Sequence, residues 1–392
     1  MSRIFKTITT IILALLLSTM FIACDDNSSE ESAKTTGEFV YELETGTREN
    51  ADGEDEEYEY YKITGYTITS EDALKMAEGD FSSVASKRDI VIPNEYEGKP
   101  VEEIASMAFA DQIILKSVKF NEDTKIKTIG LGAFSGCINL KSIENLPFIG
   151  KSADAVGEER VMGHLFGTAS SNSANTVVTA KVYDEKEEAD VTFNVPTSLT
   201  TITTTSAIVP ECAFYGFTML QNVSVPNATE IGASAFADCS AIVNIVLPKV
   251  EYIYDGAFSN CAALQTIDLT GNTTLSYIGD MAFSGCSYFG YNYVSEDEET
   301  LTFVIPDTVT YLGQGVFSNC ALLKYVKVGA GVTEIKAGTF ENCKELIKVD
   351  IKSDVTIRYA AFFGCAEGEI KVYVNGELIE LKDVDSGKVE IA

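Results

Sequence analysis

The residues best suited to chemistry in this 392-residue chain are nine cysteines and a single histidine, His164. No serine or cysteine has the spacing of a nucleophile elbow, and no acid is placed to orient the His164 ring. No two cysteines are closely paired, which disfavours a tetrahedral zinc site. Carboxylates are so abundant that no pair marks a glycosidase, and no glycine-rich phosphate loop is present. The sequence therefore predicts no enzymatic activity, no metal site and no cofactor.

The chain is strongly acidic, with 59 aspartates and glutamates against 29 lysines and arginines, a formal net charge of −30. Nucleic acids and anionic membrane surfaces attract clustered lysine and arginine, so the charge argues against both as the main partner. Hydrophobic residues make up 45% of the chain, which is enough for a sizeable core. Composition therefore indicates a folded protein that does not bind nucleic acid.

Most of the cysteines occupy one repeated position, three residues after a phenylalanine. These seven are Cys137, Cys239, Cys261, Cys286, Cys320, Cys343 and Cys365. An exported protein is expected to pair its cysteines, but seven is an odd number, and one position repeated along the chain indicates one packing role. We therefore interpret these thiols as buried, reduced and structural.

The phenylalanines before these cysteines belong to a longer series that anchors a repeat. The anchors are Phe109, Phe134, Phe166, Phe214, Phe236, Phe258, Phe283, Phe317, Phe340 and Phe362, at intervals of 22–25 residues apart from three longer gaps. A period of this size predicts a solenoid, whose stacked coils confine insertions to loops. The longer gaps place insertions at residues 145–204 and 287–300.

Each unit reads Ile-Gly-x-x-Ala-Phe-x-x-Cys-x-x-Leu-x-x-Val-x-Ile-Pro, most clearly from Ile231 to Pro248. Its second half alternates inward and outward side chains, as a short strand does, and proline ends the strand. In Ala-Phe-x-x-Cys the phenylalanine and cysteine are three apart, which places them on one face of a helical turn. The predicted fold is a repeat solenoid of about ten coils, mostly β with short helical turns.

This unit resembles the BspA-like leucine-rich repeat family of bacterial surface proteins, over residues 90–365. The segment around Gly163–Thr168 fits the unit poorly and is interpreted as a degenerate or expanded repeat. Members of the family often bind host or neighbouring-cell partners and share no enzymatic activity. The resemblance therefore implies an extracellular protein or glycan as the partner.

The ends of the repeat array define the remaining regions. We assign the solenoid to residues 90–368, an N-terminal cap to residues 58–89 and a β cap to residues 369–392. In the β cap, Asn375-Gly376 between two apolar runs predicts a type I′ hairpin. Residues 24–57 are so acidic that self-repulsion predicts a disordered tether. The acidic run at residues 52–57 lacks the spaced ligands of a calcium loop, and we interpret it as a charged spacer.

Residues 1–23 have the form of a secretory signal peptide, because Arg3 and Lys6 precede an uncharged apolar run at residues 8–23. The run ends in Ala23-Cys24, which resembles a bacterial lipobox, although Phe21 replaces the usual leucine. That resemblance implies a lipid anchor on Cys24 and a place in the bacterial cell envelope, exposed at the surface. An ordinary signal peptide with an incidental cysteine and a single transmembrane anchor remain open alternatives.

The outward positions of the predicted strands indicate where a partner binds. They are small and mostly neutral in the middle of the array, whereas the last three strands offer Tyr325, Lys327, Lys348, Lys371 and Tyr373. Tyrosine gives contact area at low entropic cost, and lysine could steer an acidic partner. We take these five residues as the candidate partner-binding surface of a monomeric, non-enzymatic adhesion protein.

Two other functions stay open at this point. The array could be a structural envelope protein without a specific ligand, because lysines on exposed strands also block edge pairing and aggregation. A carbohydrate-active surface protein is a more distant alternative, since no catalytic constellation stands out.

Replacing Cys24 tests the lipid anchor. Because acylation requires the thiol, Cys24→Ala should release the protein from the membrane fraction, which fractionation and immunoblotting measure. A mutant that stays anchored and is processed to the same size would contradict the lipoprotein interpretation.

Overall fold

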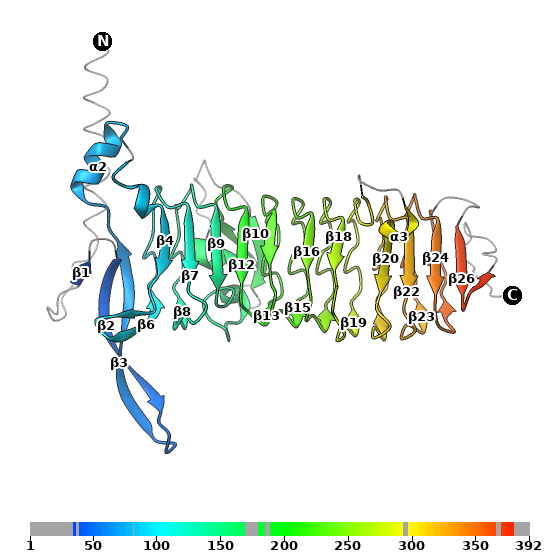
Figure 1. Cartoon of the computed structure of the whole chain (residues 1–392), viewed down its shortest axis with the longest axis horizontal. Coiled ribbons are helices and arrows are strands. Elements are labelled where there is room, and N and C mark those ends of the chain that lie inside the picture. The colour runs from blue at the N-terminus through cyan, green and yellow to red at the C-terminus, as the bar shows by residue number, and fades with distance from the viewer. Residues whose placement is uncertain are drawn as a thin grey trace, which may run out of the picture.

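The computed structural model describes residues 34–36, 39–80, 82–168, 179–184, 189–292, 297–365 and 370–379. These residues form an elongated β-solenoid, in which successive strands lie side by side along the long axis (Figure 1). The signal peptide, Cys24 and residues 24–33 and 37–38 of the expected tether lie outside the described residues. Within the described part of the chain, no helix is both long enough and apolar enough to cross a membrane.

One side of the solenoid, here termed the strand face, is built from one parallel strand per coil. Its strands are β4 (Asp89–Ile92), β7 (Ser117–Phe120), β9 (Ser142–Leu146), β12 (Thr201–Thr204), β14 (Asn222–Ser224), β16 (Asn244–Val246), β18 (Thr266–Asp268), β20 (Thr302–Ile305), β22 (Tyr325–Val328), β24 (Lys348–Ile351) and β26 (Lys371–Val374). Side chains alternate between the core and the outside, as in β20, where Phe303 and Ile305 are buried and Val304 is exposed.

The strand face is divided into three sheets. β4, β7, β9, β12 and β14 form the first, β16 and β18 the second, and β20, β22, β24, β26 and β27 (Glu377–Ile379) the third. Pairing is therefore interrupted twice among the described strands, between β14 and β16 and between β18 and β20.

A second strand, of two residues in every case except β6, precedes the phenylalanine turn in most coils. These strands are β6 (Lys99–Ile104), β8 (Thr128–Ile129), β13 (Ile208–Val209), β15 (Glu230–Ile231), β17 (Tyr252–Ile253), β19 (Tyr277–Ile278), β21 (Tyr311–Leu312), β23 (Glu334–Ile335) and β25 (Thr356–Ile357). β13, β15, β17, β19 and β21 pair in parallel without interruption. This side of the molecule is therefore continuous where the strand face is divided.

The turn around each anchor phenylalanine is not the helical turn predicted from Ala-Phe-x-x-Cys. The residues two before and two after the anchor have positive φ, as in Ser234 (52°) and Asp238 (62°) around Phe236. A left-handed residue interrupts a right-handed helix, so two of them at this spacing exclude a helical turn. The exception among the described coils is the one around Phe166, which forms the 3₁₀ helix η3 (Met162–Phe166).

The anchor rings stack along the solenoid and form the centre of its core. From Phe214 to Phe362, successive anchor centroids are 5.0–5.7 Å apart and the ring planes differ by 3–13°. Each turn is also bonded to the next coil: the N–H of Phe236, for example, donates to the carbonyl of Ala257 at 2.8 Å. Coil spacing is therefore fixed jointly by stacked rings and by backbone hydrogen bonds.

The seven repeat cysteines are buried and form no disulfide bonds. Each Sγ donates to the carbonyl of the anchor phenylalanine in the preceding coil, at 2.9–3.2 Å. Burial raises the pKa of the Cys137 thiol to about 12, so this thiol stays protonated and unreactive. Cysteine at this position is a small buried side chain that also bonds one coil to another.

The long gap between Phe134 and Phe214 contains one complete coil and one inserted hairpin. After η2 (Gly157–Arg160), η3 provides the turn of the coil, and β10 (Thr179–Asp184) pairs antiparallel with β11 (Ala189–Asn194) to form the hairpin. β12 then returns to the strand face and pairs with both β9 and β14. The insertion expected at residues 145–204 was thus too long, because it included a strand of the solenoid.

His164 lies in η3 and belongs to the packing of that coil. Its ring is 4% exposed, and Nε2 lies 3.2 Å from the carbonyl oxygen of Ile129 in the preceding coil. Burial lowers the pKa of His164, because the charged imidazolium is poorly solvated there. The single histidine of the chain is therefore a core residue.

The N-terminal region corrects the disordered tether expected over residues 24–57. β2 (Phe39–Glu49) and β3 (Asp55–Tyr66) form a long antiparallel hairpin, which projects from the end of the solenoid (Figure 1). β1 (Lys34–Thr36) pairs with β2. Alternating side chains give the hairpin a buried face, on which Tyr41 and Tyr61 pack, and the net charge of the segment does not reveal this face.

The hairpin also closes the open end of the phenylalanine stack. Phe39 meets the ring of Phe109 edge to face at 6.2 Å, and Tyr66 lies 5.9 Å from the same ring. β3 pairs in parallel with β6, and β5 (Glu95–Tyr96) pairs antiparallel with β6. α2 (Ser70–Ala77) and η1 (Ala85–Lys87) follow the hairpin and precede β4. A capped end protects apolar rings that the next coil would otherwise cover.

The C-terminal end is covered by a short hairpin. β26 and β27 pair antiparallel around Asn375 (φ 52°) and Gly376 (φ 83°), the left-handed pair that a type I′ turn requires. The second insertion contains α3 (Glu298–Leu301), which leads directly into β20.

Thiol accessibility tests the role assigned to the cysteines. Under denaturing, non-reducing conditions, the eight cysteines beyond Cys24 should titrate as free thiols, because none of them is disulfide-bonded. Mostly oxidised thiols would contradict the packing role.

Cys261→Ser should lower the free energy of unfolding by about 1–3 kcal/mol in chemical denaturation. Cys212→Ser is the matched control, since Cys212 is only half-buried, and it should cost less.

The pH dependence of stability tests the burial of His164. Its pKa is lowered in the fold from a value of about 6.5 in the unfolded chain, so the folded state takes up the proton less readily. As the pH falls below about 6.5, the unfolded chain is protonated before the folded one, so the free energy of unfolding decreases. Denaturation of the wild type and of His164→Gln across this range should give a flatter pH profile for the variant. Identical profiles would place the ring in solvent.

Candidate functional site

The five residues predicted to bind a partner lie together on the third sheet of the strand face. Tyr325, Lys348 and Lys371 are aligned across β22, β24 and β26. Lys327 and Tyr373 belong to the parallel row two residues further along the same strands. Lys371 is exposed and the other four are half-buried. The structure thus assembles these side chains into one continuous patch, termed here the C-terminal patch.

The charge of the C-terminal patch is more balanced than the lysines alone suggest. Asp350 lies between Lys327 and Tyr373 in the same row, and Nζ of Lys348 is 2.9 Å from Oε1 of Glu298 in α3. The hydrogen bond to Glu298 raises the pKa of Lys348, and its ammonium also lies 5.3 Å from the centroid of the Tyr373 ring. Three lysines therefore meet two carboxylates, which weakens the expected preference for an acidic partner.

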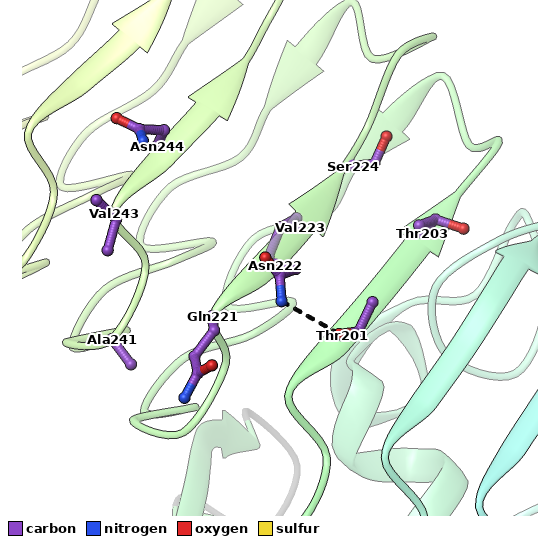
Figure 2. Close-up of a pocket in the computed structure, with 9 residues that line it drawn as sticks. All are labelled: Thr201, Thr203, Gln221, Asn222, Val223, Ser224, Ala241, Val243 and Asn244. Carbon is purple, nitrogen blue, oxygen red and sulfur yellow. Dashed lines mark hydrogen bonds between the residues drawn. The ribbon is translucent and has the colours of Figure 1, made fainter.

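A shallow pocket of about 540 Å³ opens on the strand face where pairing stops between β14 and β16. Figure 2 shows its lining: Thr201, Thr203, Gln221, Asn222, Val223, Ser224, Ala241, Val243 and Asn244. Asn222 donates to the Thr201 hydroxyl at 3.4 Å across the first sheet. The lining carries amides and hydroxyls but no ionisable side chain.

A second pocket of about 300 Å³ lies at the other interruption, between β18 and β20. Asn244 lines this pocket as well as the first, and Gln265, Thr266, Tyr291 and Asn292 are among its other lining residues. Again no aspartate, glutamate, lysine, arginine or histidine lines the pocket. The sequence predicts a small, neutral middle of the strand face, but the types of the outward residues do not indicate where strand pairing stops.

A row of tyrosines lies along the strands that precede the phenylalanine turns, β17, β19 and β21, and was not predicted from the sequence. Tyr277 and Tyr311 stack at 4.5 Å, Tyr252 stacks on Tyr254 at 6.0 Å, and Nζ of Lys336 lies 3.7 Å from the centroid of the Tyr311 ring. Burial raises the pKa of Tyr277 to about 12. The sequence does contain a pattern that could have predicted this row: a tyrosine stands six residues before each of three successive anchor phenylalanines, Phe258, Phe283 and Phe317. The stacked faces are occupied by neighbouring rings and Lys336, which indicates a structural ladder more than an open binding surface.

Chemical sites are not evident in the described part of the chain. No group of three or more histidine, cysteine, aspartate or glutamate side chains among these residues could hold a metal ion. His164 and the repeat cysteines, the residues first considered for catalysis, are committed to the core. In the described part of the chain, the exposed features suited to function include the C-terminal patch and the two neutral pockets.

Comparison with solved structures finds bacterial leucine-rich repeat proteins of low sequence identity. A leucine-rich repeat protein from Bacteroides ovatus is 17% identical, with 91% of this chain and 81% of that chain covered and a TM-score of 0.38. A leucine rich cell surface protein from Faecalibacterium prausnitzii is 18% identical, with coverages of 90% and 97% and a TM-score of 0.30. No curated protein matches the chain.

The match to a family model is more extensive. Six copies of the BspA type leucine rich repeat region match residues 54–153, 190–300 and 289–375, which is most of the chain. The matched ranges contain nine of the ten anchor phenylalanines and leave out the coil around Phe166, whose turn alone is a 3₁₀ helix among the described coils. The chain belongs to the BspA-type leucine-rich repeat family.

Proposed function

We propose that this protein is a non-enzymatic, lipid-anchored binding protein of the bacterial cell surface, which presents its strand face to an extracellular partner. The observation that carries the proposal is the C-terminal patch. Two tyrosines and three lysines from three successive strands share one outward face, on a sheet that is continuous from β20 to β27. Repeat solenoids provide extended surfaces of this kind for binding.

The composition of the patch favours a protein partner. Tyr325 and Tyr373 are half-buried, so their rings are positioned before binding and lose little conformational entropy. The mixed charges of Lys327, Lys348 and Asp350 suit complementary pairing at the rim of an interface more than bulk attraction to a highly acidic ligand. The anchor on Cys24 and the signal peptide rest on the sequence pattern and support export to the surface.

A structural envelope role without a ligand is the competing function. It predicts that the outward residues of the array are interchangeable with other solvated side chains. A pull-down with the mature protein from host-cell or matrix extract, followed by titration of any captured protein, separates the two functions. Deleting the array and measuring cell adhesion provides a second test.

The tyrosines of the patch give the sharpest prediction. Tyr325→Ala combined with Tyr373→Ala should weaken binding of the captured partner at least tenfold, about 1.4 kcal/mol, because both anchoring rings are lost. Calorimetric titration measures the change. Tyr252→Ala combined with Tyr359→Ala is the matched control, since both tyrosines are exposed and lie outside the patch. Unchanged affinity in the first variant, with its fold intact by circular dichroism, would exclude the patch as the binding site.

A further inference from the structure

We propose that the two neutral pockets and the strands between them form a binding site for a neutral oligosaccharide. The site runs along the solenoid axis from β14, across the two-stranded sheet of β16 and β18, to the second insertion. Asn244 lines both pockets and joins them into one strip. This site is separate from the C-terminal patch and does not depend on the function proposed for it.

The first pocket lies where the backbone hydrogen bonding between two neighbouring coils, those of β14 and β16, is interrupted. The residue just before a strand of the strand face usually bonds to the preceding coil. The N–H of Gln221, before β14, donates to the carbonyl of Thr200, and the N–H of Gln265, before β18, donates to the carbonyl of Val243. At the junction between the coils of β14 and β16, no backbone hydrogen bond joins Gln221 to Val243, and both of these residues are described. Both line the pocket, so its wall includes backbone groups that are not paired with each other.

The sequence supplies a physical reason for this interruption. The coil of β14 has Phe217 where seven other coils have cysteine, and Phe217 is fully buried. Its ring meets that of Phe214 edge to face at 5.7 Å. Phenylalanine is larger than cysteine, but the stacked rings of Phe214 and Phe236 remain 5.0 Å apart. The coil must therefore accommodate the additional volume of Phe217 without a wider spacing of the stack. Val223, whose equivalents in the preceding strands are all buried, is only half-buried in β14.

The second pocket has a related origin. Phe289 takes the place that leucine has in most other units, three residues after Cys286, and packs against Phe303 at 4.9 Å. Gly290 N–H still donates to Gln265, after which the chain leaves the coil for the insertion. The strand that would pair with β18 is thereby displaced. Both interruptions therefore coincide with an extra phenylalanine in the core.

The geometry excludes an inserted peptide strand as the occupant of the first pocket. A strand placed between two others separates them by about 9.6 Å, twice the ordinary spacing. Cα atoms of β14 and β16 still come within 8 Å of each other, and the coils remain joined through Cys239 Sγ and the carbonyl of Phe214 at 3.0 Å. The ligand must therefore enter from outside and bind through groups smaller than a β-strand.

The chemistry of the lining selects hydroxyl groups. Neither pocket is lined by an aspartate, glutamate, lysine, arginine or histidine, in a chain of which 22% is charged. Asn222, Asn244 and Gln265 each offer both donors and acceptors, which matches hydroxyls that donate and accept at once. Asp268, the one acid of β14, β16 and β18, lines neither pocket. A neutral saccharide meets these demands without the desolvation of a charge.

Size and shape agree with this assignment. The first pocket, at about 540 Å³, is within the range of about 300–1,000 Å³ that holds small ligands. Tyr291 lines the second pocket and adds an aromatic surface to its polar groups. An oligosaccharide long enough to span β16 and β18 would contact both pockets, with Asn244 at the junction.

A glycan array probed with the full chain tests the proposal. The array carries neutral chains of hexose and N-acetylhexosamine together with sialylated and sulfated chains. We expect binding to a subset of the neutral chains, confirmed by calorimetric titration of the strongest. Asn222→Ala combined with Asn244→Ala should weaken that binding at least tenfold. Both side chains are exposed on the surface, so the fold should be preserved, as circular dichroism can verify.

Two further variants make the result specific. Lys119→Ala combined with Val304→Ala changes outward strand-face residues that line neither pocket, and saccharide binding should be unchanged. Tyr325→Ala combined with Tyr373→Ala should also leave it unchanged, which separates this site from the C-terminal patch. No binding to any neutral chain, preference for acidic chains, or full binding by the asparagine variant would each overturn the proposal. Loss of protein-partner binding alone in the asparagine variant would assign the strip to a protein interface and overturn it as well.

Discussion

The structure depends on one constraint: each coil must complete the hydrogen bonding and the packing of the coil before it. The turn around the anchor phenylalanine meets both demands in a few residues. Left-handed residues two before and two after the anchor direct its N–H toward the next coil, as in the bond from Phe236 to Ala257. The ring stacks on its neighbours, and the cysteine thiol bonds back to the previous anchor carbonyl. No coil could satisfy these groups alone.

Because all the coils stack at a similar spacing, a larger side chain in the core changes the structure of the surface above it. Phe217 in place of cysteine and Phe289 in place of leucine are both buried, and both accompany an interruption of the strand face. The strands before the phenylalanine turns remain paired from β13 to β21 across the same coils. The array therefore opens on one side only, and a core substitution that preserves hydrophobicity still shapes an exterior site.

The sequence predicts the parts of the fold that repeat and fails where pairing is not periodic. Anchor spacing identifies the coils, and the shared position of the cysteines indicates their burial. The β2–β3 hairpin was missed because its strands stabilise each other across the turn, which a count of charges along residues 24–57 does not register. Glu298 reaches Lys348 across 50 residues, from an insertion without a repeat pattern. Both pockets lie where strand pairing is interrupted, and a sequence pattern indicates which strands form more readily than where two neighbouring strands fail to pair.

The interrupted pairing of the strand face has a mechanical consequence. In a linear array held at one end and pulled at the other, every junction between neighbouring coils carries the same load. Rupture then begins at the weakest junction, whatever the average strength of the others. On the strand face, the junction between β14 and β16 and the junction between β18 and β20 both lack the strand pairing that joins β16 to β18. Tension would therefore part the molecule first at one of these two junctions near its middle, into two blocks that each keep a stacked phenylalanine core.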